Sequence, residues 1–483
     1  MSSRPGARGR GALAIVLHTH MPYVEGFGTW PFGEEWLWEA IAGCYLPLLD
    51  LLDSHEPPIT LSLTPVLGDQ LGAPGLADRF RCFIGQTRRF THAEDAAGLR
   101  AGGHDGLALE LERAWSEDYE HARRRFAERD EDLLAAFARH ARWTSSATHA
   151  VLPLLATDAC VSLQVESGIA AHLARLDGWQ GGFWLPECAY GPELEPLLAR
   201  AGVRATCIES TGRYGLGAPA HLRPLVSEAG VVLYPIDRAT IALVWSDGGY
   251  PADGLYRDYH RHTVHHHNPW RNDGGAYDAK AAYARARTHA VDFVARTQER
   301  LSREGKGQPG GGLAVCAFDT ELLGHWWYEG LVWLEAVIEE CARQGLELVG
   351  LDEAAERFEP APIGRGQALG VTSWGQGGGL STWSGPAVAD MAFATRAAEL
   401  RTVAGAVAGT AGPAAIRELL ALQASDWAFM VSRGLAVPYA EERFAGHRAA
   451  LERALAEGPA ASEAGLRGLA GHADPKVLLA SAG

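Results

Sequence analysis

The stretch Leu313–Trp327, LAVCAFDTELLGHWW, holds the pattern that decides the fold. Its six apolar residues end directly at Asp319, and a histidine with two tryptophans follows. A short apolar run that stops at a polar residue is typical of a strand buried on both faces of a sheet. Because (β/α) barrels carry their active sites at the carboxyl ends of their strands, Asp319 is a candidate for chemistry. The structural alternative for this residue is a helix N-cap.

Similar apolar runs recur along the chain, and they predict a parallel α/β sheet or barrel. Segments with helical spacing separate them, among them Glu35–Leu52, Leu194–Ala201 and Val332–Gln344. The further candidate strands are Ala12–Leu17, Ile59–Thr64, Gly182–Leu185, Ala205–Ile208, Val231–Tyr234 and Leu346–Val349.

The predicted barrel spans residues 11–360, with a helical insertion at about residues 72–142, where Ala, Arg and Glu recur at helical spacing. A glycine-rich connection, residues 361–383, leads to a helical domain over residues 384–483. We expect residues 1–10 to be a disordered tail. The helices expected in the C-terminal domain are Val388–Val407, Ala414–Val431 and Pro438–Ala456.

The composition limits the partners and the compartment. A formal net charge of -16 disfavours nucleic acid and anionic membranes as partners. The apolar run behind Arg10 is too short for a signal peptide, and no run approaches the roughly 20 residues that a bilayer span needs. The seven cysteines are scattered without a CxxC pair, which indicates reduced thiols. We therefore expect a cytoplasmic protein, as a monomer or a small homo-oligomer.

A second candidate carboxylate is Glu187, in the segment Phe183–Tyr190, FWLPECAY. It follows an apolar strand and a proline that prevents further ladder pairing, so its side chain is well placed to project into a barrel mouth. Taken alone, it could equally be a helix N-terminal or surface charge. Together, two strand-end carboxylates are what retaining glycosyl transfer requires: one attacks the anomeric carbon and the other protonates the leaving oxygen.

The segment Leu17–Tyr23, LHTHMPY, places His18 and His20 at another strand end. Two imidazoles at this spacing can share one metal ion, with a third ligand from elsewhere, such as the run at residues 265–267. Histidines that bind substrate hydroxyls and purely structural histidines are the alternatives.

The chain has fifteen tryptophans, a high number for its length. Several, including Trp30, Trp326, Trp374 and Trp383, stand near Gly, Pro or His outside clean amphipathic repeats. Exposed aromatic faces in a cleft bind the apolar faces of sugars, which favours a carbohydrate substrate, although core packing is the alternative for each ring.

Seven segments in the same order from about Ala12 to about Leu451 together resemble glycoside hydrolase family 57, and most closely its α-1,4-glucan branching enzymes. They are HTHMPY, WPFGEEWLWEA, GFWLPECAY, VWSDGGYPADGLYRDYHR, AFDTELLGHWWYEG, TSWG and LQASDW. The resemblance implies an incomplete (β/α)7 barrel, a cytoplasmic enzyme acting on α-1,4-glucans, and neither cofactor nor metal.

The resemblance also implies roles at single positions. Glu187 matches the nucleophile that forms a covalent glycosyl-enzyme, and Asp319 matches the general acid and base. His18 and His20 match positions that line the sugar subsite at the point of cleavage, and His149 resembles a strand-end histidine of that site. The remaining substrate-binding positions implied are the aromatic platforms Trp30, Trp270, Trp374 and Trp383, and His325 with Trp326 in the segment after Asp319.

The acceptor decides the product once Glu187 holds the glycosyl chain: water gives hydrolysis, a 4-hydroxyl gives disproportionation and a 6-hydroxyl gives a branch. Branching enzymes of this family are thought to close a tyrosine-bearing loop over the intermediate. Here the matching segment, residues 210–219, is compact, and Tyr214 is its one tyrosine. If the loop is truncated, an α-1,4-glucan hydrolase or a 4-α-glucanotransferase with little branching is the alternative to a branching enzyme.

Two hypotheses of other classes remain at this point. A non-catalytic glucan-binding protein could have kept the groove, although the presence of both carboxylates argues against it. A metal-dependent, deacetylase-like hydrolase on a similar barrel would use the histidines as ligands and would lose activity with a chelator.

Overall fold

The computed structural model describes residues 11–176, 178–363 and 369–480. The expected tail at residues 1–10 lies outside this part of the chain, as does a portion of the expected connection at residues 361–383. None of the described helices is long and apolar enough to cross a membrane.

Parallel strands form the centre of the molecule. The first sheet has the order β4-β3-β2-β1-β8, and β9 pairs with the start of β1. Its strands are β1 (Ala12–Thr19), β2 (Thr60–Leu63), β3 (Ala141–Ser145), β4 (Phe183–Trp184), β8 (Leu313–Asp319) and β9 (Glu347–Leu348). The second sheet has the order β10-β6-β7-β5 and consists of β5 (Ala205–Ile208), β6 (Leu225–Val226), β7 (Val232–Pro235) and β10 (Ala361–Pro362).

Two backbone contacts join the sheets into a ring. Gly182 forms a parallel bridge to Ala205, which connects β4 with β5. The amide of Asp237, just after β7, donates to the carbonyl of Val315 in β8 at 2.8 Å. Within the described chain, the order β1-β2-β3-β4-β5-β7-β8 therefore returns to β1, which confirms the (β/α)7 barrel fold.

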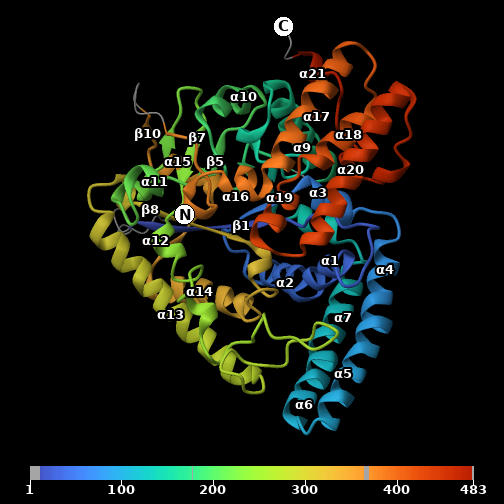
Figure 1. Cartoon of the computed structure of the whole chain (residues 1–483). Helices are drawn as coiled ribbons and strands as arrows, with labels where there is room; N and C mark the ends of the chain where they lie inside the picture. The colour runs from blue at the N-terminus through green and yellow to red at the C-terminus, as the bar shows by residue number, and fades with distance from the viewer. Residues whose placement is uncertain (1–10, 177, 364–368, 481–483) are drawn as a thin grey trace.

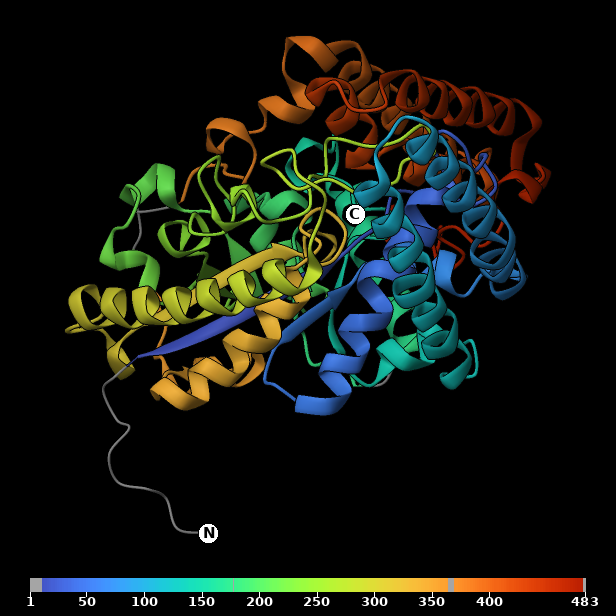
Figure 2. The same cartoon turned by 90° about the horizontal axis from the view of Figure 1, so that it is seen from below.

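Helices cover the outside of this ring. Figure 2 shows α13 (Ala279–Glu304) and α14 (Gly330–Gln344) running alongside β1. Between β1 and β2, α1 (Glu34–Ala40) and α2 (Leu46–His55) are joined by a π-helical turn, Ile41–Tyr45. The other barrel helices are the 18-residue α9 (Asp158–Arg175) and the short helices α3 (Pro65–Leu71), α10 (Glu195–Arg200), α11 (Thr211–Tyr214), α12 (Arg238–Ile241) and α15 (Leu351–Arg357).

The helical insertion extends away from the strands, beside α1 and α2 (Figure 1). It consists of α4 (Leu76–Cys82), α5 (Arg89–Ala101), α6 (Asp105–Arg113), α7 (Glu120–Glu128) and α8 (Leu133–Ala138). The prediction ran the insertion through residue 142, but β3 already begins at Ala141. This strand was missed because it directly follows a helix and carries the exposed Arg142.

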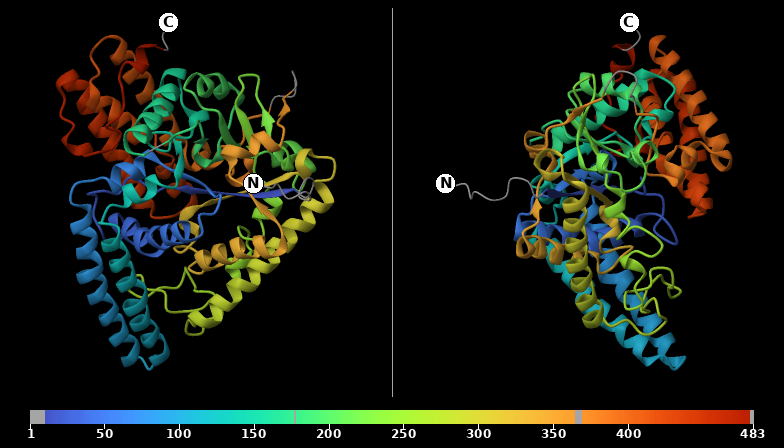
Figure 3. Two further views of the ribbon diagram at one scale, coloured as in Figure 1. Left: turned by 180° about the vertical axis from the view of Figure 1, so that it is seen from behind. Right: turned by 90° about the vertical axis from the view of Figure 1, so that its left-hand side faces the viewer.

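The C-terminal helices gather at one side of the barrel, well separated from the end of the helical insertion (Figure 3). They are α16 (Ser381–Ser384), α17 (Ala389–Val407), α18 (Pro413–Leu422), α19 (Ser425–Arg433), α20 (Val437–Glu457) and α21 (Val477–Ala480). The single helix expected over Ala414–Val431 is wrong, because the backbone is extended at Ala424 (φ -55°, ψ 133°). Ala424 forms an antiparallel bridge to Ala150, so a contact with the barrel replaces the helical turn.

Candidate active site

The carboxyl ends of the barrel strands bring the predicted carboxylates and histidines together. His18 lies near the end of β1 and is in register with Asp319, the last residue of β8. Glu187 lies three residues after the end of β4, and His149 follows β3. Because the strands are parallel, their side chains meet at one edge of the barrel, as expected for this fold.

Glu187 is held in an unusual backbone conformation. Its φ of 61° and ψ of 20° place it in the left-handed region, as does the φ of 50° at Cys188. For a non-glycine residue this conformation costs about 1–3 kcal/mol, and such residues cluster at functional sites. The surrounding backbone fixes it: the amide of Cys188 donates to Leu185 at 2.8 Å, and the amide of Trp374 donates to Glu187 at 3.1 Å.

The Glu187 carboxylate accepts two hydrogen bonds from distant segments. The indole Nε1 of Trp374 donates to Oε2 at 3.0 Å, and the hydroxyl of Ser425 donates to Oε1 at 2.9 Å. Burial raises the pKa of Glu187, whereas these two donors oppose the rise because they favour the charged carboxylate. Ser425 begins α19, so the helical region after the barrel contributes directly to this carboxylate.

Asp319 has a different electrostatic environment. Burial raises its pKa well above the ordinary value of an aspartate, and the charges of Glu321 and Glu187 raise it further. The charge of His20 opposes this effect. Such surroundings favour the protonated form of the carboxyl group.

Three histidines form a stack between these carboxyl groups. The rings of His20 and His149 are 3.8 Å apart and nearly parallel, and His18 bonds to His149 through their Nε2 atoms at 2.9 Å. Nδ1 of His18 contacts the Ser62 hydroxyl at 2.8 Å, and Nδ1 of His149 contacts the Ser425 hydroxyl at 2.8 Å. The three rings are thereby fixed in orientation.

The three histidines differ in charge. Burial lowers the pKa of His18 and of His149 well below the usual value, and the charge of His20 lowers both further. Burial also acts to lower the pKa of His20, but Asp426 and other carboxylates outweigh it and the net shift is upward. Nε2 of His20 lies 2.9 Å from the Asp426 carboxylate. The stack therefore combines one ring that readily carries a charge with two neutral rings.

The ligand atoms of His20, His149 and Asp426 all lie within 4.8 Å of one another, which raises the metal hypothesis again. A metal ion lies close to the plane of each imidazole that binds it. Since the two rings are stacked 3.8 Å apart with only 15° between their planes, the planes do not meet within bonding distance of both rings. This geometry suits hydrogen bonds to a substrate better than metal coordination, and a metal-free site stays our prediction.

The predicted aromatic positions fall into two groups. Trp374 is half-buried against Trp184, Trp326 is 38% exposed, and Trp30 is 50% exposed with its ring 4.1 Å from that of His266. His325 lies edge-on to Tyr259 at 5.7 Å. These four side chains are accessible or lie beside accessible ones, as a substrate groove requires.

Trp270 and Trp383 differ from the expectation of open platforms. Trp270 is only 9% exposed and the guanidinium of Arg261 covers its ring at 4.4 Å. Trp383 is 3% exposed and packs with Val151 and Ala189. The sequence placed both near glycine and proline-rich stretches, but tertiary packing buries these two rings in the described structure.

Tyr214 ends the short helix α11 and is 36% exposed. Its ring lies 6.0 Å from that of His221. Among the ring contacts and hydrogen bonds of the described residues, Tyr214 reaches neither Glu187 nor Asp319. In the described structure, Tyr214 is therefore not bonded to either catalytic carboxyl group.

Sequence reasoning missed Ser425, Asp426, Glu321 and Tyr45 as parts of the site. The first two belong to the segment LQASDW, which carried the family resemblance but suggested no contact. Glu321 lies two residues after Asp319 and accepts from the Tyr45 hydroxyl at 2.6 Å. Its position just after the strand-end Asp319 is a signal that could have identified Glu321, because residues at the carboxyl ends of barrel strands form the active site.

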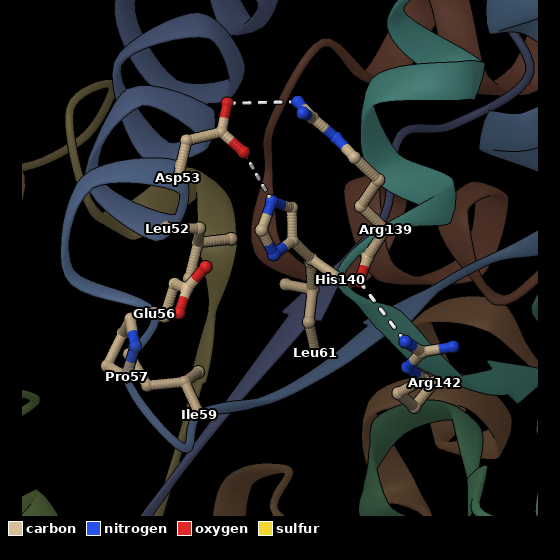
Figure 4. Close-up of a pocket in the computed structure, with 9 residues that line it drawn as sticks. All are labelled: Leu52, Asp53, Glu56, Pro57, Ile59, Leu61, Arg139, His140 and Arg142. Carbon is tan, nitrogen blue, oxygen red and sulfur yellow. Dashed lines mark hydrogen bonds and ion pairs between the residues drawn. The ribbon is translucent and has the colours of Figure 1, made fainter.

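A cavity of about 490 Å³ lies at the opposite end of the strands, near the starts of β2 and β3. Figure 4 shows Arg139 and His140 both directed at Asp53, at 2.9 and 2.8 Å. Arg142 donates to the carbonyl of Arg139 at 3.4 Å. Because these charges are engaged with one another, we assign no chemistry to this cavity.

Comparison with known proteins identifies the family of this arrangement. Residues 143–364 match the model for glycosyl hydrolase family 57, and residues 389–465 match the model for the C-terminal part of 1,4-alpha-glucan branching enzyme. A probable 1,4-alpha-glucan branching enzyme of Mycobacterium tuberculosis is 32% identical over 494 residues, which cover 90% of this chain and 89% of the relative. The chain belongs to glycosyl hydrolase family 57.

Two further relatives of this family 57 chain agree with that result. The 1,4-alpha-glucan branching enzyme of Thermococcus kodakarensis is 32% identical, over 91% of this chain and 72% of the relative. The crystal structure of a family 57 branching enzyme from Pyrococcus horikoshii superposes with a TM-score of 0.83 at 29% identity, over 91% of this chain and 88% of that one. The resemblance expected from the sequence motifs is thereby confirmed.

Proposed function

We propose that the protein is a retaining 1,4-α-glucan branching enzyme, with Glu187 as nucleophile and Asp319 as general acid and base. The observation that carries this assignment is the contrast between the two carboxyl groups. Glu187 receives two hydrogen-bond donors that favour its charged form, whereas Asp319 faces two other carboxyl groups that favour its protonated form. Environments that push two titrating groups apart support an acid and base assignment.

The reaction follows from these protonation states. The ionised carboxylate of Glu187 attacks the anomeric carbon, the bond to the 4-oxygen breaks, and Asp319 gives its proton to the departing glucan. A 6-hydroxyl of an acceptor glucan then loses its proton to Asp319 while its oxygen attacks the anomeric carbon and releases Glu187. The products are one new α-1,6 bond and the regenerated enzyme.

We assign substrate binding to the side chains around the two carboxyl groups. His18, His20 and His149 bind the sugar at the point of cleavage, and their mutual contacts fix them before substrate arrives. Trp30, Trp326, Trp374 and His325 line the glucan groove. Trp270 and Trp383 are left out of this substrate-binding set, since both rings are buried.

We further propose that the enzyme works in the cytoplasm on an internal glucan, as a monomer or a small homo-oligomer. All seven cysteines are free thiols and six of them are buried, which supports a reducing compartment. The division into a barrel, a connecting segment and a helical domain at residues 360 and 384 stays part of this proposal.

The second candidate is an α-1,4-glucan hydrolase or 4-α-glucanotransferase with little branching. The position of Tyr214 favours it, because the ring of this residue packs edge-on to that of His221 and forms no hydrogen bond with either carboxyl group in the described structure. An intermediate that stays accessible to water is hydrolysed more readily.

Incubation with amylose separates the two candidates. We expect proton NMR to show new α-1,6 linkages while the number of reducing ends stays nearly constant. The Glu187→Gln variant has a neutral side chain of the same shape and is the negative control. It should form neither α-1,6 linkages nor new reducing ends. Reducing ends that accumulate without an α-1,6 signal would establish the hydrolytic alternative.

A further inference from the structure

Glu321 is a third carboxyl group in the site, and the reaction steps above do not use it. It lies on the 3-10 turn Thr320–Leu322 and is only 7% exposed. Its Oε1 accepts from the hydroxyl of Tyr45 at 2.6 Å and from the backbone amide of His20 at 3.2 Å. Both donors are neutral groups, so neither of them neutralises the negative charge of this buried carboxylate. Burying a charge without an opposite charge beside it is energetically unfavourable.

The groups around Glu321 come from four elements. Tyr45 and Cys44 belong to the π-helical turn and are fully buried, and His20 follows β1. Asp319 ends β8 two residues earlier, and Glu187 follows β4. Charge on Glu321 therefore acts on Asp319, with Glu187 as the other acidic neighbour and His20 as the basic one.

The two donors make Glu321 able to hold that charge. Burial raises its pKa to about 7, while the hydrogen bonds from Tyr45 and from His20 oppose the rise. Glu321 is thus partly ionised near neutral pH, and its charge raises the pKa of Asp319. Like charges at close range resist the ionisation of the second group.

We propose that Glu321 is a positioning residue of the transfer reaction: anchored by Tyr45 and the His20 amide, its carboxylate keeps the proton on Asp319 until the leaving oxygen takes it. This inference rests on the proposed roles of Glu187 and Asp319. It assigns to Glu321 no contact with the substrate. Removing its charge should therefore change the pH dependence of the reaction rather than abolish the reaction.

The test is the pH profile of kcat/KM for amylose with the full-length Glu321→Gln variant. Glutamine keeps the acceptor oxygen for Tyr45 and His20 but carries no charge. We expect the basic limb of the profile, which reports proton loss from Asp319, to move to lower pH by about one unit. A basic limb at the wild-type position overturns the proposal, whatever happens to the maximal rate.

Two further variants keep this test decisive. Tyr45→Phe removes one donor, so Glu321 ionises less readily and the basic limb should move in the same direction by a smaller amount. If Glu321→Gln does not fold, the position of the basic limb in Tyr45→Phe tests the proposal by itself. Glu329→Gln is the matched control, since Glu329 is 0% exposed in the same segment but contacts the amide of Arg257 at 3.2 Å. An equal shift in that control would overturn a specific role for Glu321.

A parallel assay separates this inference from the proposed function. Asp319→Asn should be nearly inactive on amylose but should still react with α-glucosyl fluoride, whose leaving group needs no proton. If Asp319→Asn stays active on amylose, the proposed function fails. If it behaves as expected while Glu321→Gln leaves the basic limb in place, only the role of Glu321 fails.

Discussion

The end of β4 and the end of β8 each present one carboxyl group to the same edge of the barrel, and they do so by different means. Glu187 follows β4 in a left-handed backbone conformation and is held by Trp374 and Ser425, which are far away in the sequence. Asp319 ends β8 in an ordinary extended conformation (φ -63°, ψ 132°), in register with His18. One carboxylate is oriented by hydrogen-bond donors, and the other is surrounded by acidic neighbours.

The two carboxyl groups therefore have different roles because the fold surrounds each of them with different neighbours. Donors lower the free energy of the charged form, and acidic neighbours raise it. A retaining mechanism requires one charged and one protonated carboxyl group at the start of each cycle. Each prediction below alters one side of this comparison.

The largest effect should follow from neutralising either carboxyl group. We expect Glu187→Gln to lower kcat on amylose by about 10⁶-fold, as for loss of a nucleophile, and Asp319→Asn by about 10²–10⁴-fold. Initial rates at saturating amylose measure both values. Circular dichroism checks that the variants are folded, and equal losses in both would contradict the difference in roles.

A smaller effect should follow from removing the donors of Glu187. In Ser425→Ala and in Trp374→Phe the charged carboxylate loses one hydrogen bond, so the pKa of Glu187 rises and the acid limb of kcat/KM moves to higher pH. We expect a shift of about one pH unit in each variant, with the basic limb unchanged. Movement of the basic limb instead would show that these donors act on Asp319.

Weakening the contact between the helical region and the barrel should change the pKa of Glu187 and leave that of Asp319 unchanged. Glu399 on α17 is 0% exposed and accepts from the Ala156 amide at 3.0 Å, the Thr157 hydroxyl at 2.7 Å and Gln423 at 3.2 Å. We expect Glu399→Ala to lower the free energy of unfolding by about 1–3 kcal/mol and to move the acid limb slightly upward.

Denaturant unfolding measures this loss, and Glu452→Ala provides the control. Glu452 on α20 forms an exposed ion pair with Arg401, which lies on α17 like Glu399, so its removal should change the free energy of unfolding by less than about 1 kcal/mol. A loss of the same size in both variants would indicate that Glu399 has no special role in docking.

The smallest effect is expected from Trp383→Phe. Its ring is 3% exposed, so the variant should change KM for amylose less than the replacement of the half-exposed Trp30 by alanine. Steady-state rates across amylose concentrations measure both. A larger rise of KM in Trp383→Phe than in Trp30→Ala would show that the buried ring opens toward the substrate.

The sequence predicted the parts of this site that follow from local patterns. Asp319 and Glu187 were found because each ends an apolar run, a relation visible within about ten residues. Ser425 and Asp426 were not found, because their contacts with Glu187 and His20 join positions 238 and 406 residues apart. The break between α18 and α19 was missed for a related reason, since no helix-breaking residue marks Ala424 and its extended backbone depends on the bridge to Ala150.

The bond between Ser425 and Glu187 has a consequence for how freely the parts of this chain could be recombined. A fragment that ended before α17 would retain every strand of the barrel, yet the nucleophile would lose one of its two donors and His20 would lose its acidic partner. The C-terminal helices thus contribute residues to the catalytic centre. Exchanging them between relatives would alter the catalytic centre itself.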